Sequence, residues 1–64
     1  MTINALTWQE QFKNARMATG LAQAKLATTL QIPRRSIENW EAGVNEPPVW
    51  VQKLLLEKLE TLKQ

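Results

Sequence analysis

The chain has 64 residues and contains neither cysteine nor histidine, which excludes disulfides, thiolate chemistry and nearly all transition-metal sites. Its only acidic side chains are six glutamates, and so short a chain rarely encloses a deep pocket, so we expect neither an enzyme nor a bound cofactor, metal or small-molecule ligand. The net charge is +2, with +4 on residues 1–35 and −2 on residues 36–64. This asymmetry fits one half facing a polyanion, although chance in a small sample explains it equally well.

Length and hydropathy predict a single domain over residues 1–64. A chain of this size buries only about 60% of the surface that its unfolded state exposes. It therefore needs a compact core, a cross-link or a partner to be stable. No apolar run approaches the roughly 18 residues of a membrane span. Residues Met1–Leu6 lack the basic region and long apolar block of a secretory signal. We therefore expect a cytoplasmic protein with no membrane contact.

The first predicted element is a helix over residues 8–19. Thr7 and Glu10 have the spacing of a capping box, in which each side chain binds the backbone amide of the other residue. Gly20 supplies the left-handed residue that ends a helix. The residues expected to face the core follow at helical spacing and are Trp8, Phe12, Ala15 and Thr19.

Two short helices follow, over about residues 23–30 and 34–42. Leu26, Ala27 and Leu30 share one side of the first. Pro33 stands at the start of the second, where its missing N–H costs nothing, and Gly43 ends it. The apolar side of the helix over residues 34–42 is thin and consists of Ile37 and Trp40.

The last predicted helix covers about residues 49–62, and Pro48 can open it. Lys58 falls near the middle of its expected core side, so its ammonium group must reach past that side to water. Val49 and Leu56 are expected on the opposite side. The expected core residues of this helix are Val51, Leu54, Leu55, Leu59 and Leu62. The fold class is all-α, as a compact bundle of four to five helices.

The second and third helices together meet the physical requirement for reading a DNA major groove. About three residues separate them, and the second of the pair has a polar outer side that begins with Arg34 and Arg35. A helix fits the major groove, its first turn points at base edges, and the preceding helix braces it across the backbone. A purely structural helix of this length usually shows more than two core positions.

These residues also carry a resemblance to a known family. The run GLAQAKLA from Gly20 to Ala27, followed by IPRRSIENWEAG from Ile32 to Gly43, resembles the phage repressor/Cro-like (XRE) helix-turn-helix family. The family pattern is roughly G-L-T-Q-x-x-L-A, a turn, and S-x-x-[ST]-I-x-x-W-E-x-G. The similarity extends over about residues 12–59, and the segment from Ile32 to Glu41 is especially similar to small members from bacteria and their mobile elements. It implies a lambda-repressor-like DNA-binding fold.

The resemblance implies a set of site residues. Gln23 would contact a phosphate or base edge, Arg34 and Arg35 would reach guanine, and Ser36 would approach the DNA backbone. Arg16 and Glu41 match an internal ion pair of some members. Three departures stand out: Ala22 replaces the usual capping Thr or Ser, Gln31 replaces the usual turn glycine, and the last helices are fused or truncated. The remaining expected DNA contacts are Asn39, Lys25 and the backbone amides of Val44 and Asn45.

The function that follows is sequence-specific binding of double-stranded DNA by a bacterial or mobile-element transcriptional regulator, a repressor by resemblance and nucleoid-associated when bound. Residues 34–42 would enter the major groove. One unit supplies few base contacts, so a homodimer is expected, with Val49, Trp50 and Leu56 as its candidate patch. The alternative is a helical adaptor or antitoxin-like partner of another protein that keeps the fold without reading DNA. A third option is an architectural or replication role on DNA without promoter control.

Overall fold

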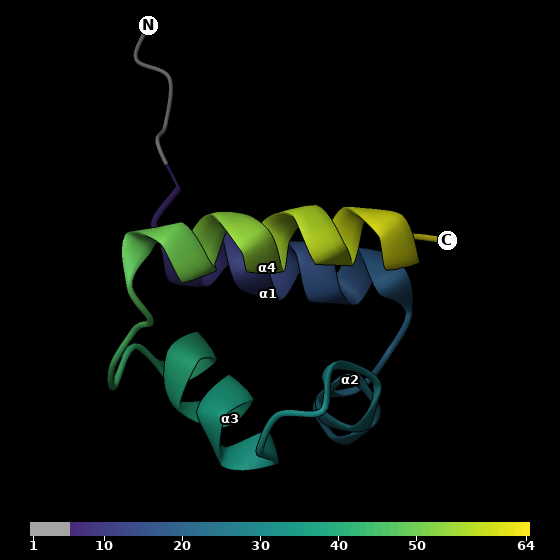
Figure 1. The fold of residues 1–64 in the computed structure, drawn as a ribbon, viewed down its shortest axis with the longest axis horizontal. Coiled ribbons are helices and arrows are strands. Elements are labelled where there is room, and N and C mark those ends of the chain that lie inside the picture. The colour runs from purple at the N-terminus through teal and green to yellow at the C-terminus, as the bar shows by residue number, and fades with distance from the viewer. Residues whose placement is uncertain (1–5) are drawn as a thin grey trace, which may run out of the picture.

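The computed structural model describes residues 6–64, which form four helices (Figure 1). They are α1 (Trp8–Thr19), α2 (Gln23–Leu30), α3 (Arg34–Ala42) and α4 (Val49–Leu62). These bounds coincide with the predicted ranges, and residues 6–64 hold the lower of the two expected numbers of helices. The expectation about a secretory signal rests mainly on Met1–Ala5, which lie outside the described residues. None of the four helices combines the length and the apolar character needed to cross a membrane.

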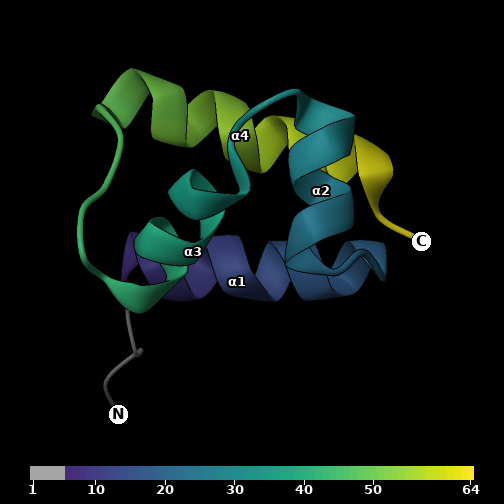
Figure 2. The ribbon, with the colours of Figure 1, turned by 90° about the horizontal axis from the view of Figure 1, so that it is seen from below.

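The four helices lie in two layers. α1 and α4 lie side by side and run in the same direction, as two perpendicular views show (Figure 1, Figure 2). α2 and α3 form the second layer, which lies against one side of the α1–α4 pair. Residues 31–33 connect α2 to α3. α3 and α4 therefore lie on opposite sides of the core, and each keeps an outward side free of the other.

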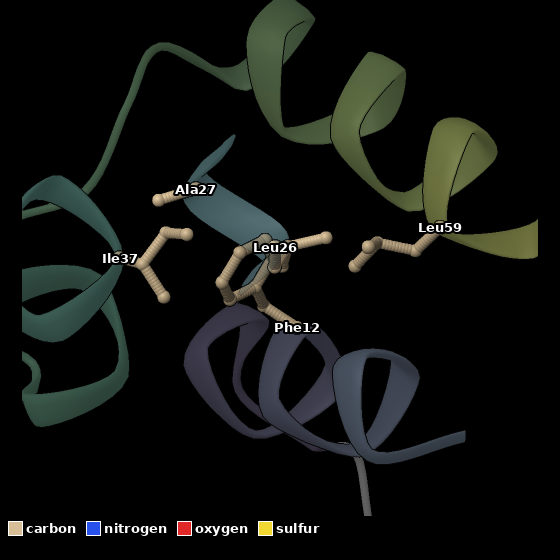
Figure 3. Packing of buried hydrophobic residues seen from close by; sticks show 5 residues of the cluster. All are labelled: Phe12, Leu26, Ala27, Ile37 and Leu59. Carbon is tan, nitrogen blue, oxygen red and sulfur yellow. The ribbon is translucent and has the colours of Figure 1, made fainter. Parts of the chain in front are cut away.

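Every helix contributes to one buried cluster. Phe12 comes from α1, Leu26 and Ala27 from α2, Ile37 from α3 and Leu59 from α4, and the side chains converge between the layers (Figure 3). Each fully buried side chain of this size contributes about 1.5–3 kcal/mol relative to an exposed one. Since each layer alone would expose its half of this cluster, the pairing of the layers keeps α3 in place.

An aromatic cluster extends the core between α1 and α3. The Trp8 ring stacks on Phe12 with centroids 5.0 Å apart, and Trp40 meets Trp8 and Phe12 edge-on at 5.9 and 5.7 Å. Pairs of this geometry each add about 0.5–1.5 kcal/mol beyond the area that they bury. Trp40 thus anchors the second half of α3, as the sequence pattern predicts.

Local sequence signals determine where α1 begins and ends. The Thr7 hydroxyl accepts the Glu10 amide at 3.2 Å and the Glu10 carboxylate accepts the Thr7 amide at 2.9 Å, which completes the predicted capping box. Gly20 ends the helix with φ +78°. Phe12 and Thr19 are fully buried on the predicted core side.

The segment between α2 and α3 is shaped by one left-handed residue that is not glycine. Gln31 has φ +59°, and its amide and that of Ile32 bond back to the last carbonyls of α2. A side chain in this region costs about 1 kcal/mol or more, so Gln31 carries strain at a position where glycine would carry none. Neither Ala22 nor Pro33, the residues before α2 and α3, makes a side-chain cap.

The prediction of which α4 residues face the core is wrong at one position. Leu59 is buried and Val51, Leu55 and Leu62 are half-buried, but Leu54 is 54% exposed. Because each helical residue advances by about 100°, Leu54 lies about 140° around the helix from Leu59.

The same geometry corrects the expected homodimer patch. Leu56 lies three residues before Leu59, about 60° away, and is half-buried rather than on the outward side. Val49 and Trp50 are exposed as expected. The two large apolar residues that share the outward side of α4 at i,i+4 spacing are therefore Trp50 and Leu54.

Candidate nucleic-acid interface

Arg35 lies on the side of α3 opposite to its buried side. Ile37 is fully buried and Trp40 packs against the core, whereas Arg35 is exposed in the first turn. Since successive residues are about 100° apart, Arg35 is on the far side of the helix from both. Within residues 6–64 its exposed guanidinium group takes part in no ion pair, so it remains available to an external anion.

Arg34 is exposed beside it but is partly engaged. Its Nε lies 2.9 Å from Glu38 Oε2, one turn further along α3, and the two side chains are 61% and 45% exposed. A surface pair of this kind contributes about 0–1 kcal/mol. Arg34 can therefore be released toward an anion at small cost, while Glu38 leaves a negative charge on the same side.

Ser36 and Asn39 are both half-buried. Asn39 follows Arg35 by four residues, which places it one turn further along the outward side. Ser36 lies nearer the buried side, and its backbone amide donates to the Pro33 carbonyl at 3.0 Å. Of the residues predicted on α3, Arg35 and Asn39 thus share one side, and Arg34 and Ser36 flank it.

An ion pair fastens the end of α3 to α1. Arg16 Nε lies 2.6 Å from Glu41 Oε2 and Arg16 Nη2 lies 3.1 Å from Glu41 Oε1, with the two side chains 14% and 6% exposed. Arg16 Nη1 also donates to the Leu21 carbonyl at 3.0 Å. The pair that the resemblance implies is thus formed, in the two-pronged geometry that suits a guanidinium and a carboxylate.

Gln23 joins this network, and the sequence pattern alone does not indicate it. Its Nε2 donates to Glu41 Oε1 at 2.9 Å, so the first residue of α2 is held against the last turn of α3. The bond fixes the orientation of the amide, because only the NH₂ group can face a carboxylate oxygen. Gln23 is half-buried, and its carbonyl oxygen and its second amide hydrogen remain for an external partner.

Lys25 is exposed on α2, two residues after Gln23. The first turn of α2 contains no acidic residue, and the same holds for the first turn of α3. Both helix starts also lack a side-chain cap, so their first amides are free to bind an anion. Positive charge and free N–H groups thus occur together at the two helix starts.

The loop after α3 differs from its expected role at one residue. The Val44 amide donates to the Asn39 carbonyl at 2.9 Å, as part of the helix end at Gly43, and is not offered to a phosphate. Val44 instead exposes 68% of its apolar side chain. Asn45 is exposed, so it is the residue of this pair that can still act as predicted.

Residues 6–64 hold no cluster of three or more side chains suited to a metal ion, and no pocket occurs in this part of the chain. The candidate surface is therefore described by its exposed side chains rather than by a cavity. Comparisons of the chain with protein-family models, with curated proteins and with solved structures give no match in any of the three.

Proposed function

We propose that the chain binds double-stranded DNA in a sequence-specific manner and regulates transcription, with α2 and α3 acting as a helix-turn-helix of the phage repressor/Cro-like type. α3 would enter the major groove from its first turn, and α2 would lie across the phosphate backbone. The observation that carries the proposal is Arg35: an unpaired guanidinium group on the side of α3 that points away from the core.

The charges at the start of α3 support this proposal. Two arginines in the first turn oppose the helix macrodipole, which favours anions there by about 0.3–1 kcal/mol. No acidic residue in that turn compensates for them. An external polyanion would remove this unfavourable interaction. Arg35 could then contact guanine through two hydrogen bonds, and Asn39 one turn later could contact adenine in the same way.

The Arg16–Glu41–Gln23 network supports the proposal because it would hold α2 and α3 in a fixed relative orientation. It ties the start of α2 to the end of α3 through one buried carboxylate, so the angle between the two helices resists change. A protein that recognises base edges needs such rigidity, because its hydrogen bonds require side chains that are positioned to within about 0.5 Å.

A second candidate function is supported by the exposed Trp50 and Leu54 on α4, which suit an apolar protein partner. Salt dependence separates the two functions. We expect the affinity for a duplex, followed by fluorescence anisotropy, to fall by orders of magnitude between about 50 and 200 mM salt, because binding releases counterions from several phosphates. An affinity for duplexes that is absent at 50 mM salt would favour the adaptor function instead.

A further inference from the structure

Glu38 lies on the outward side of α3, beside the residues proposed to contact DNA. It follows Arg35 by three residues and is therefore about 60° from it around the helix, whereas Trp40 on the core side is about 160° away. Its side chain is 45% exposed. If α3 enters the major groove through Arg35, the same orientation brings the Glu38 carboxylate to the base edges. A negative charge there is unfavourable near phosphates unless a specific donor faces it.

Helix stability does not account for the pairing of Glu38 with Arg34. The basic residue precedes the acidic one by four positions, which is the weaker of the two orders within a helix. Both side chains are largely in contact with water, where ion pairs contribute little. Arg34 also stands in the first turn, where the helix dipole disfavours a cation. The pair is therefore better explained by what it presents to a ligand than by folding.

The pair holds the carboxylate through one oxygen and leaves the other unoccupied. Arg34 Nε lies 2.9 Å from Glu38 Oε2. Within residues 6–64, no hydrogen bond is formed to Glu38 Oε1, so this oxygen can still accept one. The guanidinium group partly neutralises the carboxylate and restricts its position, which lowers the cost of bringing it near phosphates. It also keeps Glu38 away from Arg35, whose donors stay available to a base.

We infer that Glu38 determines part of the base specificity, by accepting a hydrogen bond at Oε1 from the N4 amino group of a cytosine, with Arg34 as its positioning residue. The inference rests on the proposed function, because it needs α3 in the major groove. Three residues along a helix correspond to a rise of about 4.5 Å, and successive bases of one strand are about 3.4 Å apart. The cytosine should therefore lie about one base pair from the base that Arg35 contacts.

The chemistry of the base edges favours cytosine over the other three bases. Guanine and thymine present only acceptors in the major groove, so Glu38 Oε1 would face lone pairs and lose its water without a replacement. Adenine presents an amino group, but its N7 acceptor lies beside that group and would repel the carboxylate. The amino group is the only polar group that cytosine presents there. Glu38 thus favours one base and disfavours the others.

The test combines selection of bound sequences from random duplex DNA with anisotropy titrations at about 50 mM salt. The wild type should bind a duplex with the selected cytosine roughly tenfold more tightly than the same duplex with thymine at that position. Glu38→Ala should reduce this preference to about twofold or less. The position that Glu38→Ala affects should differ from the one that Arg35→Ala affects. Glu38→Gln should shift the preference toward adenine, because an amide both donates and accepts.

Two further variants separate positioning from charge. Arg34→Ala should weaken the cytosine preference at the same base pair as Glu38→Ala does, since the carboxylate is then no longer held. An effect of Arg34→Ala confined to another base pair would overturn its positioning role. The matched control is Glu60→Ala, which removes the same charge from an exposed ion pair with Lys63 on α4, 3.4 Å long. It should leave the cytosine preference unchanged.

The outcomes distinguish the inference from the proposed function. A folded wild type that retains no duplex contradicts the proposed function, and the inference fails with it. If the wild type enriches a motif and Glu38→Ala enriches the same motif with the same base preferences, only the inference is overturned. The same holds if Glu38→Ala raises the affinity for every duplex equally, because Glu38 would then act only as a repelling charge. Circular dichroism confirms that each variant is folded.

Discussion

α3 and α4 cover opposite sides of one core, and their outward sides differ in chemistry. α3 directs Ile37 and Trp40 inward and presents Arg35, Glu38 and Asn39 outward. α4 also packs on the core but presents Trp50 and Leu54 to water. The contrast shows that one small core can carry outward sides of different chemistry: the outward side of α3 is polar and the outward side of α4 is apolar.

The largest expected effect comes from comparing two tryptophans on these helices. Trp40→Ala removes the ring that joins α3 to Trp8 and Phe12, and such truncations cost about 3–5 kcal/mol, close to the whole stability of a small domain. Trp50→Ala removes a mostly exposed ring and should change stability by about 0.5 kcal/mol or less. Urea unfolding followed by circular dichroism measures both. Equal destabilisation by the two would contradict the division into buried and outward sides.

A comparison of two glutamates on α3 follows. Glu41→Gln breaks the buried pair with Arg16, and removal of one partner from such a pair costs about 3–5 kcal/mol. We expect the lower end of that range, since Arg16 keeps some contact with water. Glu38→Gln breaks only an exposed pair, worth about 0–1 kcal/mol. Chemical denaturation of both variants tests this, and a smaller loss for Glu41→Gln than for Glu38→Gln would refute the role assigned to the network.

Arg35→Ala tests the outward side of α3 without disturbing the core. It should weaken binding to a preferred duplex by about 1–3 kcal/mol and relax base preference at one position, with the melting temperature unchanged. Lys13→Ala, on exposed α1 surface, is the control and should alter neither property by a comparable amount. Anisotropy titrations with matched and mismatched duplexes provide the measurement. Equal affinities for Arg35→Ala and the wild type would remove Arg35 from the interface.

The smallest effect concerns the turn that sets the angle between α2 and α3. Gln31→Gly should raise stability by about 1 kcal/mol, because glycine adopts the left-handed conformation without the cost borne by a side chain. Ala18→Gly, within α1, should lower stability by about 1 kcal/mol. Thermal unfolding of both variants compares the signs. A loss of stability in Gln31→Gly would show that the side chain contributes a contact larger than its strain.

Helix ends could be predicted because short-range chemistry determines them. Thr7 with Glu10, and the glycines at 20 and 43, act through bonds within a few residues of themselves. The bond between Gln23 and Glu41 links residues 18 positions apart, and no periodicity reports such a contact. The resemblance predicted the ion pair between Arg16 and Glu41. It assigned Gln23 only a contact with DNA and did not indicate its hydrogen bond to Glu41.

The outward side of α4 was harder to predict for a different reason. Leu54, Leu55 and Leu56 are consecutive, so together they span about 200° of the helix surface and hydrophobicity cannot say which of them faces inward. The packing of Leu59 against the other helices decides that Leu54 faces outward.

The most direct test of the proposed function is selection of bound sequences from random duplex DNA, carried out in parallel with the wild type and Arg35→Ala at about 50 mM salt. We predict that the wild type enriches a short motif containing guanine and that Arg35→Ala loses the preference at one position of that motif. A wild-type protein that is folded by circular dichroism but enriches no sequence and retains no duplex would contradict the proposal that α3 reads DNA.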